Sequence, residues 1–352
     1  MTDRMPSDPI LKLEGLTKHF DMWAGAGKRS KVYALDGVTL ELARGTTLGI
    51  VGESGSGKTT LARCMLRLEE PTSGSLEIDG VDFLGASHRD VRRLRRRIQM
   101  VFQDPLDSIN PRFTCRKTLK NALRHGGIVD SQSVAERSIE LLEAVGLGAD
   151  DLGKHPHQMS GGQQQRLGIA RALAVQPSIL VLDEPTASLD VTVSAQIIDL
   201  LLSLQRDFEL SYVWISHDLR SVRRVAHDVA VMYLGNVVEI GSSATIFDAP
   251  QHPYLKALID AIPVADPDRE HATPPLEGEI PSPSAPPSGC NFRTRCPIRV
   301  ERCHVDEPTL QAVSTGSRVA CHVVRLEEAM QGYAHREQGA EVESATRRAS
   351  PG

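Results

Sequence analysis

The chain contains no run of about 18 consecutive apolar residues, which is the length that a membrane-spanning helix requires. Its first residues, Met1 to Pro6, also lack the apolar core of a secretory signal. The formal net charge of −5 over 352 residues gives no reason to expect nucleic acid as a partner. The short basic run from Arg92 to Arg97 is interpreted as a solvated helix face. We therefore expect a cytoplasmic protein.

Cysteine is almost absent from the first 289 residues, which contain only Cys64 and Cys115. Four further cysteines then follow within 32 residues: Cys290, Cys296, Cys303 and Cys321. Because a cytoplasmic setting disfavours disulfides, clustered thiols suggest a metal centre. The spacings of five, six and seventeen intervening residues match neither the usual zinc pairs nor the ferredoxin patterns. An iron–sulfur cluster, a zinc ion and plain reduced thiols all stay open, with His304 and His322 as spare ligands.

Residues 52–59 have the sequence G-E-S-G-S-G-K-T, which is the phosphate-loop pattern G-x-x-x-x-G-K-S/T. The apolar run 48–51 precedes it, so we expect a buried strand, a glycine-rich turn and a helix that begins near Lys58. Backbone N–H groups of such a turn surround phosphates. Lys58 would reach the β- and γ-phosphates, and the Thr59 hydroxyl would bind Mg²⁺. The predicted nucleotide-binding residues are Gly52, Glu53, Ser54, Gly55, Ser56, Gly57, Lys58, Thr59 and Thr60.

A second apolar run, 179–182, ends in Asp183 and Glu184. Its β-branched and aliphatic residues are typical of a buried parallel strand. Such a strand would deliver both carboxylates to the edge of the sheet. We expect Asp183 to hold Mg²⁺ and Glu184 to polarise the attacking water.

The segment 159–166 has the sequence M-S-G-G-Q-Q-Q-R. Ser160 can cap the helix that follows, and paired glycines allow backbone amides to approach a phosphate closely. Together with the phosphate loop, the S-G-G-Q motif resembles the signature of ATP-binding cassette (ABC) ATPases. The resemblance implies that catalysis needs a dimer with two sandwiched ATP molecules. In that dimer the γ-phosphate of ATP on a second subunit would be bound by Ser160, Gly161, Gly162 and Gln163.

Further positions are assigned through the same resemblance. Gln103, after a strand-like run, would link Mg²⁺ to the transmembrane contact, and Asp190 would signal across the dimer. His217, after the strand-like run 212–216, would contact the γ-phosphate. Phe20 would stack on adenine, with Tyr33 as a competing candidate because 21–31 looks like an insertion.

The order of segments predicts an α/β fold. Antiparallel strands and the phosphate loop come first, with a hairpin turn at Asp79 and Gly80. A helical insertion follows, in which Ser133 to Glu136 is a predicted capping box. Strand and helix alternation after Gly162 predicts a mainly parallel sheet. The expected architecture is an ABC-type P-loop NTPase, with a RecA-like core, an antiparallel β subdomain and a helical subdomain at about 104–160, plus a small Cys-containing C-terminal domain.

The C-terminal part carries a closer resemblance. The motifs H-P-Y at 252–254, G-E-I-P-S-P at 278–283 and G-C-N-F-R-T-R-C-P at 289–297 are similar to the extension of oligopeptide and dipeptide importer ATPases. We therefore divide the chain into a nucleotide-binding domain (8–246), an extension (247–325) with a proline-rich linker (263–288) and the four-cysteine site, and a tail (326–352) that is expected to be disordered.

This resemblance implies an ATP-hydrolysing subunit of a dipeptide or oligopeptide importer, with Glu184 as general base and with His217 and Lys58 stabilising charge. The implied partners are a second ATPase subunit, two transmembrane permease subunits and an extracytoplasmic binding protein, at the cytoplasmic face of the cell membrane. The four cysteines would bind a 4Fe–4S cluster, with Zn²⁺ as the alternative. Import of nickel, glutathione or sugar, and a soluble ABC ATPase without a transport role, are the alternative functions.

Overall fold

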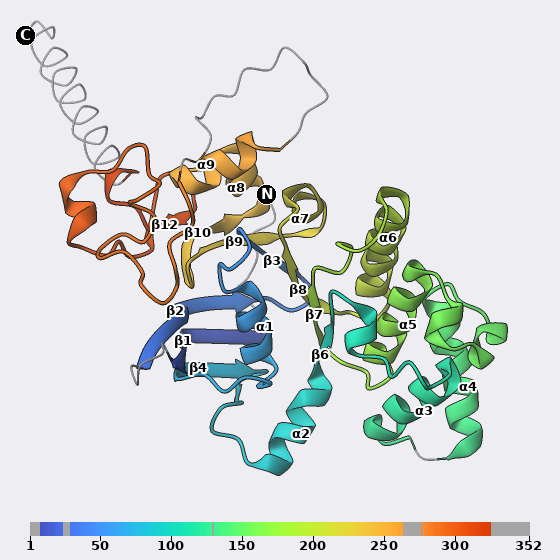
Figure 1. The fold of residues 1–352 in the computed structure, drawn as a ribbon. Helices are drawn as coiled ribbons and strands as arrows, with labels where there is room; N and C mark the ends of the chain where they lie inside the picture. Colours follow the sequence, from blue (N-terminus) through green and yellow to red (C-terminus); the bar gives the residue numbers. More distant parts are fainter. Residues whose placement is uncertain (1–7, 24–28, 129, 263–275, 277, 325–352) are drawn as a thin grey trace, which may run out of the picture. The chain divides into compact units, whose positions relative to one another are not determined.

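The computed structural model describes residues 8–23, 29–128, 130–262, 276 and 278–324 (Figure 1). The chain divides into two compact units between Asn236 and Val237, and each unit is described by itself. The division lies before residue 246, where the sequence analysis ends the nucleotide-binding domain. Strand β10 (Asn236–Ser242) pairs with a strand of the C-terminal region and is therefore counted mostly with the second unit. Residues 263–275 and 277 of the predicted linker and the predicted tail 326–352 lie outside the described residues.

An antiparallel sheet with strand order β2-β1-β4-β5 forms the N-terminal part of the first unit. Leucines of β1 lie opposite leucines of β2 in the core of this sheet. The predicted turn at Asp79 and Gly80 joins β4 to β5, and both residues have positive φ. The supposed insertion at 21–31 is in part an extension of the β1–β2 hairpin, because Asp21 pairs with Lys31. The strands are β1 (Leu11–Trp23), β2 (Arg29–Leu42), β4 (Ser73–Ile78) and β5 (Val81–Asp82).

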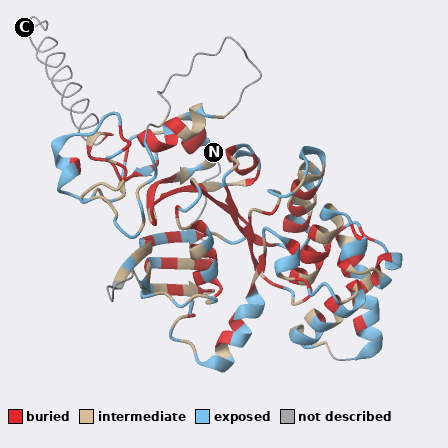
Figure 2. Ribbon diagram, in the orientation of Figure 1, coloured by how far each residue is buried: buried red, intermediate tan, exposed pale blue. Residues whose placement is uncertain are grey.

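A parallel sheet with the order β9-β3-β8-β7-β6 forms the centre of the first unit, which confirms the α/β class. Its middle strands are buried throughout (Figure 2), as their continuous apolar sequences predict. The carboxyl ends of parallel strands meet at one edge, so the loops after β3, β7 and β8 come together. The strands are β3 (Thr47–Val51), β6 (Ile98–Val101), β7 (Ile179–Asp183), β8 (Ser211–Ser216) and β9 (Asp228–Tyr233). The accompanying helices are α1 (Lys58–Met65), α6 (Val191–Asp207) and α7 (Leu219–Val225).

Helices fill most of the segment between β5 and β7. The prediction of a capping box at Ser133 was wrong: α4 begins earlier, because the Asp130 carboxylate accepts a hydrogen bond from the Ser133 N–H at 2.8 Å. In Figure 1, α3, α4 and α5 form a group beside the parallel sheet. The elements are α2 (His88–Arg97), η1 (Pro105–Asp107), α3 (Cys115–Gly126), α4 (Ser131–Ala144), η2 (Ala149–Gly153), η3 (Pro156–Gln158) and α5 (Gly161–Leu173).

The second unit is built around short antiparallel strands in the order β11-β12-β10. Its buried carboxylate, Glu239, accepts hydrogen bonds from the backbone N–H groups of Gln251 and His252 and from the Ser317 hydroxyl. Within the described ranges, no helix of either unit is long and apolar enough to cross a bilayer. The remaining elements are α8 (Ser243–Asp248), α9 (Pro253–Asp260), η4 (Glu301–His304), β11 (Gln311–Ala312) and β12 (Arg318–Val319).

Candidate nucleotide site

The phosphate loop connects β3 to α1 as the sequence predicts, and α1 begins at Lys58. Two of its glycines are required by close backbone approaches. A Cβ on Gly52 would lie 2.2 Å from the Met232 carbonyl oxygen, and one on Gly57 would lie 2.4 Å from the Ala34 carbonyl oxygen. Gly57 also has φ +102, a backbone conformation that residues with a side chain rarely adopt. The loop is thus held in place by backbone on two sides.

The Lys58 ammonium lies inside this loop. Its Nζ donates to the carbonyl oxygens of Gly52 at 2.7 Å and Glu53 at 2.8 Å, and to Ser56 Oγ at 3.3 Å. The side chain is buried, and burial lowers its pKa, whereas the charges of Glu184, Asp183 and Glu53 act in the opposite direction. A cation held among carbonyl groups at a phosphate loop is suited to binding phosphate oxygens.

Asp183 ends β7 at the same edge of the sheet. Burial raises the pKa of its carboxyl group, the charge of Glu184 raises it further, and a hydrogen bond from Thr59 lowers it. Its Oδ1 is buried and has no hydrogen-bond partner among the described residues. An unsatisfied buried carboxylate oxygen beside a threonine hydroxyl fits the oxygen ligands that Mg²⁺ requires.

Glu184 and His217 lie next to each other because their strands, β7 and β8, are neighbours. Glu184 has a left-handed backbone with φ +47, and its N–H donates to the Ile215 carbonyl oxygen at 2.9 Å. His217 Nδ1 lies 3.0 Å from Glu184 Oε1. A non-glycine residue in this conformation is strained and is common at functional sites. Lys58 begins the helix after β3, which pairs with β8, so the three predicted catalytic residues follow neighbouring parallel strands at the same edge of the sheet.

The predicted signature residues form the first turn of α5. Ser160 caps the helix: its Oγ accepts from the Gln163 N–H at 3.3 Å, and the Gln163 side chain accepts from the Ser160 N–H at 3.0 Å. Asp190 caps α6 through a single bond, in which its Oδ1 accepts from the Val193 N–H at 2.9 Å. Gln103 is exposed on a bend after β6. The nucleotide contacts of these residues stay predictions.

The two candidates for adenine stacking project from opposite faces of one hairpin. Phe20 is opposite Val32, and Tyr33 is opposite His19, in consecutive register positions of β1 and β2. Successive residues of a strand point to opposite faces, so only one of the two aromatic rings can meet an adenine. Lys18 Nζ lies 4.6 Å from the centre of the Phe20 ring, and stacking by Phe20 stays a prediction.

The four clustered cysteines lie in the second unit and influence one another. Burial raises the pKa of Cys290 to about 12 and that of Cys296 to about 11, and the other clustered thiols act in the same direction. The Cys290 N–H donates to the Cys303 carbonyl oxygen at 2.9 Å. Among the described residues, however, no three His, Cys, Asp or Glu side chains are arranged to hold one metal ion. The predicted 4Fe–4S cluster and the zinc alternative therefore have no support from this arrangement, and a single ion does not fit.

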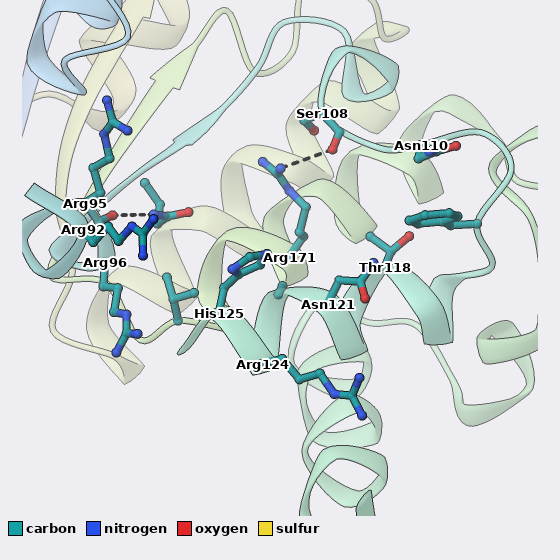
Figure 3. Close-up of a pocket in the computed structure, with 14 residues that line it drawn as sticks. Arg92, Arg95, Arg96, Ser108, Asn110, Thr118, Asn121, Arg124, His125 and Arg171 are labelled. Atoms are coloured by element: carbon teal, nitrogen blue, oxygen red, sulfur yellow. Dashed lines mark hydrogen bonds between the residues drawn. The ribbon is translucent and has the colours of Figure 1, made fainter. Parts of the chain in front are cut away.

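The sequence analysis did not identify Arg171, which is half-buried, has a buried Nε and lines a cavity beside α2 and α3 (Figure 3). The arginines of the run 92–97 are exposed on α2, in agreement with the interpretation as a solvated helix face. Three of them, Arg92, Arg95 and Arg96, also line this cavity.

Comparison with known proteins identifies two matching regions. Residues 35–187 match the family model described as ABC transporter, and residues 238–303 match the model described as oligopeptide/dipeptide transporter, C-terminal region. The probable peptide ABC transporter ATP-binding protein y4tS of Sinorhizobium fredii is 46% identical over 319 residues, which are 90% of this chain and 90% of that protein. The di/tripeptide transport ATP-binding protein DppF of Pseudomonas aeruginosa is 44% identical over 316 residues, which are 90% and 98% of the two chains.

Solved structures agree with these relatives. A dimeric ATP-binding cassette, MJ0796 in a post-hydrolysis state bound to ADP and Pi, is 30% identical with a TM-score of 0.58, covering 66% of this chain and 98% of that one. The protein cbiO1 from Clostridium perfringens, part of an ABC transporter complex, is 28% identical with a TM-score of 0.59 and covers 69% and 92%. The cassette fold and near-complete alignment with ATP-binding subunits lead to one conclusion: this chain belongs to the ATP-hydrolysing subunits of ABC transporters.

Proposed function

We propose that this ABC ATPase powers the import of dipeptides and oligopeptides. The observation that carries the proposal is that one chain contains both the ABC transporter region and the region typical of oligopeptide/dipeptide transporters. The names of the relatives, which refer to peptide and di/tripeptide transport, support the same substrate class.

The residues at the carboxyl edge of the parallel sheet can carry out the hydrolysis. The loop 52–60 would bind the β- and γ-phosphates, and Lys58 would exchange carbonyl oxygens for phosphate oxygens. Thr59, Asp183 and Gln103 would hold Mg²⁺, which neutralises charge on the phosphates when it is bound. Glu184 would accept the proton of the attacking water, and His217, beside it, would stabilise the γ-phosphoryl group.

A complete site is proposed to need a second cassette. The first turn of α5 (Ser160–Gln163) and the cap of α6 (Asp190) would contact ATP held by that partner, whether it is identical or different. The dimeric form of a solved relative supports this arrangement. Closure of the dimer would drive a conformational change in two permease subunits. An extracytoplasmic binding protein would deliver the peptide to these subunits. The chain would therefore work at the cytoplasmic face of the membrane.

Uptake in cells tests the substrate class. We expect cells that lack this chain to lose uptake of isotope-labelled dipeptides and pentapeptides, and the natural chain to restore it. The Glu184→Gln variant should not restore it. Glu143→Gln, the same change on the exposed face of α4, should restore it fully. Loss of nickel or sugar uptake with unchanged peptide uptake would contradict the proposal.

Turnover by the purified complex tests the role of Glu184 separately. We expect Glu184→Gln to bind ATP normally and to lower kcat at least about 100-fold, because removal of a general base commonly has effects of this size. Measured phosphate release in the Glu143→Gln variant should match the natural protein. Undiminished turnover of Glu184→Gln would reject the general-base role.

We also propose that the four cysteines bind a 4Fe–4S cluster with a structural or regulatory role. Such a cluster offers one iron to each thiolate, so its ligands need not converge on one point as the ligands of a single ion do. The proposal rests on the resemblance of the segment 289–297 to the extension of peptide importer ATPases, and two of the four cysteines are in backbone contact, since the Cys290 N–H donates to the Cys303 carbonyl oxygen at 2.9 Å. Protein purified without oxygen should absorb broadly near 400 nm and contain iron and sulfide in equal amounts. Zinc without iron, or no metal at all, would reject the cluster.

A further inference from the structure

Lys18, in β1, is a largely buried cation beside the ring that is predicted to stack on adenine. Its side chain is 14% exposed, and its Nζ lies over the Phe20 ring, 4.6 Å from the ring centre. One position separates the two residues, so in an extended strand they lie on the same face of the hairpin. The ammonium covers one face of the half-buried ring, and the other face is the one that a base can meet.

The Lys18 ammonium is anchored on the segment 66–72, which follows α1. Its Nζ donates to the carbonyl oxygen of Glu70 at 2.8 Å and lies 3.5 Å from Glu69 Oε2. The helix α1 begins at the phosphate loop with Lys58 and ends just before this segment. One helix thus fixes the position of the phosphate loop at its start and that of the Lys18 anchor after its end.

The backbone on either side of Lys18 is attached to the same segment. The N–H of Thr72 donates to the Thr17 carbonyl oxygen at 2.7 Å, and Thr72 Oγ1 accepts from the His19 N–H at 2.9 Å. Lys18 is therefore held through its backbone as well as through its ammonium, which restricts where its charge can lie.

The hairpin face that carries Lys18 also meets the phosphate loop. In the register of β1 and β2, Lys18 is opposite Leu35, and opposite residues share a face. Leu35 is fully buried, and its Cδ2 would lie 3.2 Å from a Cβ on Gly57 of the phosphate loop. Phe20, two positions along β1 from Lys18, is therefore on the side of the hairpin next to that loop.

The competing aromatic ring, that of Tyr33, is engaged on the other face. Its centre lies 4.6 Å from that of the His19 ring, and the two rings meet edge to face. His19 stands between Lys18 and Phe20 in β1, so its side chain points away from theirs. The contacts of the hairpin thus favour Phe20 over Tyr33 as the residue that meets a base.

We propose that Lys18 is a positioning residue for nucleotide binding, which orients the Phe20 ring and makes its open face a better platform for adenine. The inference rests on the proposed stacking of adenine on Phe20. The face of an aromatic ring carries partial negative charge and attracts a cation. A cation over one face also draws electron density from the opposite face, which reduces the repulsion between that face and a stacked base.

Calorimetry on the complete chain tests the role of Lys18 with two ligands, ADP and inorganic pyrophosphate, each with Mg²⁺. Both ligands carry a diphosphate, so the difference between their affinities isolates the contribution of the adenosine part. The test variant is Lys18→Met, which keeps the length of the side chain and removes its charge, and Lys18→Arg is the rescue variant. The matched control is Lys12→Met, the same change in the same strand, where the lysine pairs with Glu14 at 2.7 Å.

We expect Lys18→Met to weaken ADP binding about three- to tenfold, the size of a shielded cation–π contact, and to change pyrophosphate binding less than about twofold. Lys18→Arg keeps a cation over the ring, so it should bind ADP within about twofold of the natural chain, as should Lys12→Met. In ATP hydrolysis by Lys18→Met, KM should rise while kcat is unchanged, because stacking on the base is the same in the ground state and the transition state.

The variant Phe20→Leu separates this inference from the proposed stacking. It should weaken ADP binding but not pyrophosphate binding, and adding Lys18→Met to it should change ADP binding less than about twofold, because the ring through which the lysine acts is gone. Unchanged ADP binding in Phe20→Leu would overturn the stacking and the role of Lys18 together. If Phe20→Leu shows the selective loss, three results would overturn the role of Lys18 alone: no loss in Lys18→Met, an equal loss of ADP and pyrophosphate binding, or an undiminished effect of Lys18→Met when Phe20 is absent.

Discussion

At the scale of single residues, Asp183 shows how a site that is suited to a cation reduces the stability of the fold. Its carboxyl group is buried, one oxygen has no hydrogen-bond partner among the described residues, and its pKa is raised mainly by burial. A raised pKa means that the folded state binds the proton more tightly than the unfolded state does. The stability that this group contributes is therefore present below its unfolded pKa and is lost as the pH rises through its folded pKa.

From this we predict that Asp183→Asn stabilises the protein at pH 7 in the absence of nucleotide and Mg²⁺. The amide keeps the shape and needs no ionisation, so we expect Tm to rise by roughly 2–4 °C. The difference from the natural chain should disappear below about pH 4, where the unfolded carboxyl is also protonated. Calorimetry across this pH range measures the effect, and Mg²⁺-dependent hydrolysis should be lost. A lower Tm at pH 7 would show that ionised Asp183 stabilises the fold.

At the scale of elements, Gly162 is where the signature meets the packing of α5 against α6. A Cβ on Gly162 would lie 2.6 Å from Val193 Cγ1, and valine in a helix has little freedom to rotate away. A Cβ on the preceding Gly161 would lie 3.5 Å from Leu189 Cδ2, which is an ordinary contact. The close packing of α5 against α6 is therefore sufficient to require glycine at position 162, whereas it does not require glycine at position 161.

We predict that Gly162→Ala lowers the unfolding free energy by about 1–3 kcal/mol through overpacking. Gly161→Ala should cost less, and adding Val193→Ala to Gly162→Ala should recover most of the loss because it removes the clashing methyl group. Urea unfolding of the three variants measures these values. If Val193→Ala gives no recovery, the contact between the two helices is not the cause.

At the scale of the whole molecule, acid should affect the second unit through one buried histidine. His252 is 1% exposed, and burial lowers its pKa to about 3. Its Nδ1 accepts from the Tyr254 N–H at 3.1 Å, so the neutral ring caps α9. The unfolded chain binds a proton at this position below about pH 6.5, whereas the folded chain does so only near pH 3. Stability from His252 is thus complete above pH 6.5 and is lost as the pH falls toward 3.

We predict that the unfolding free energy of the second unit falls by about 2 kcal/mol between pH 6.5 and 5, at about 1.4 kcal/mol per pH unit. His252→Asn should flatten this slope, because asparagine retains a capping oxygen but does not titrate. The variant should be less stable at pH 7, since it loses the ring that lies 5.5 Å from Phe292. Hydrogen exchange of α9 at several pH values measures both effects. Equal slopes in the two proteins would assign the acid sensitivity to another group.

Local sequence was sufficient for the elements of the nucleotide site. The strand before Gly52, the start of α1 at Lys58 and the cap at Ser160 follow from short-range rules, because a strand end or a helix cap involves residues only a few positions apart. Local rules were insufficient at Ser133, where Asp130 is the cap, and at 21–31, where the hairpin continues. At the first position, the Asp130 carboxylate caps the helix three residues before Ser133. At the second, backbone pairing of β1 with β2 continues into the segment that was expected to be an insertion.

The amino-acid sequence by itself determined the class of fold, the phosphate loop and the identity of the acidic and basic groups that handle phosphate. Only the tertiary structure decided which of these groups meet. The contact of Glu184 with His217 and the hydrogen bond from Thr59 to Asp183 join positions that are far apart in the chain. The physical reason is that charge and burial depend on all neighbours in space, whereas sequence patterns report mainly the neighbours along the chain.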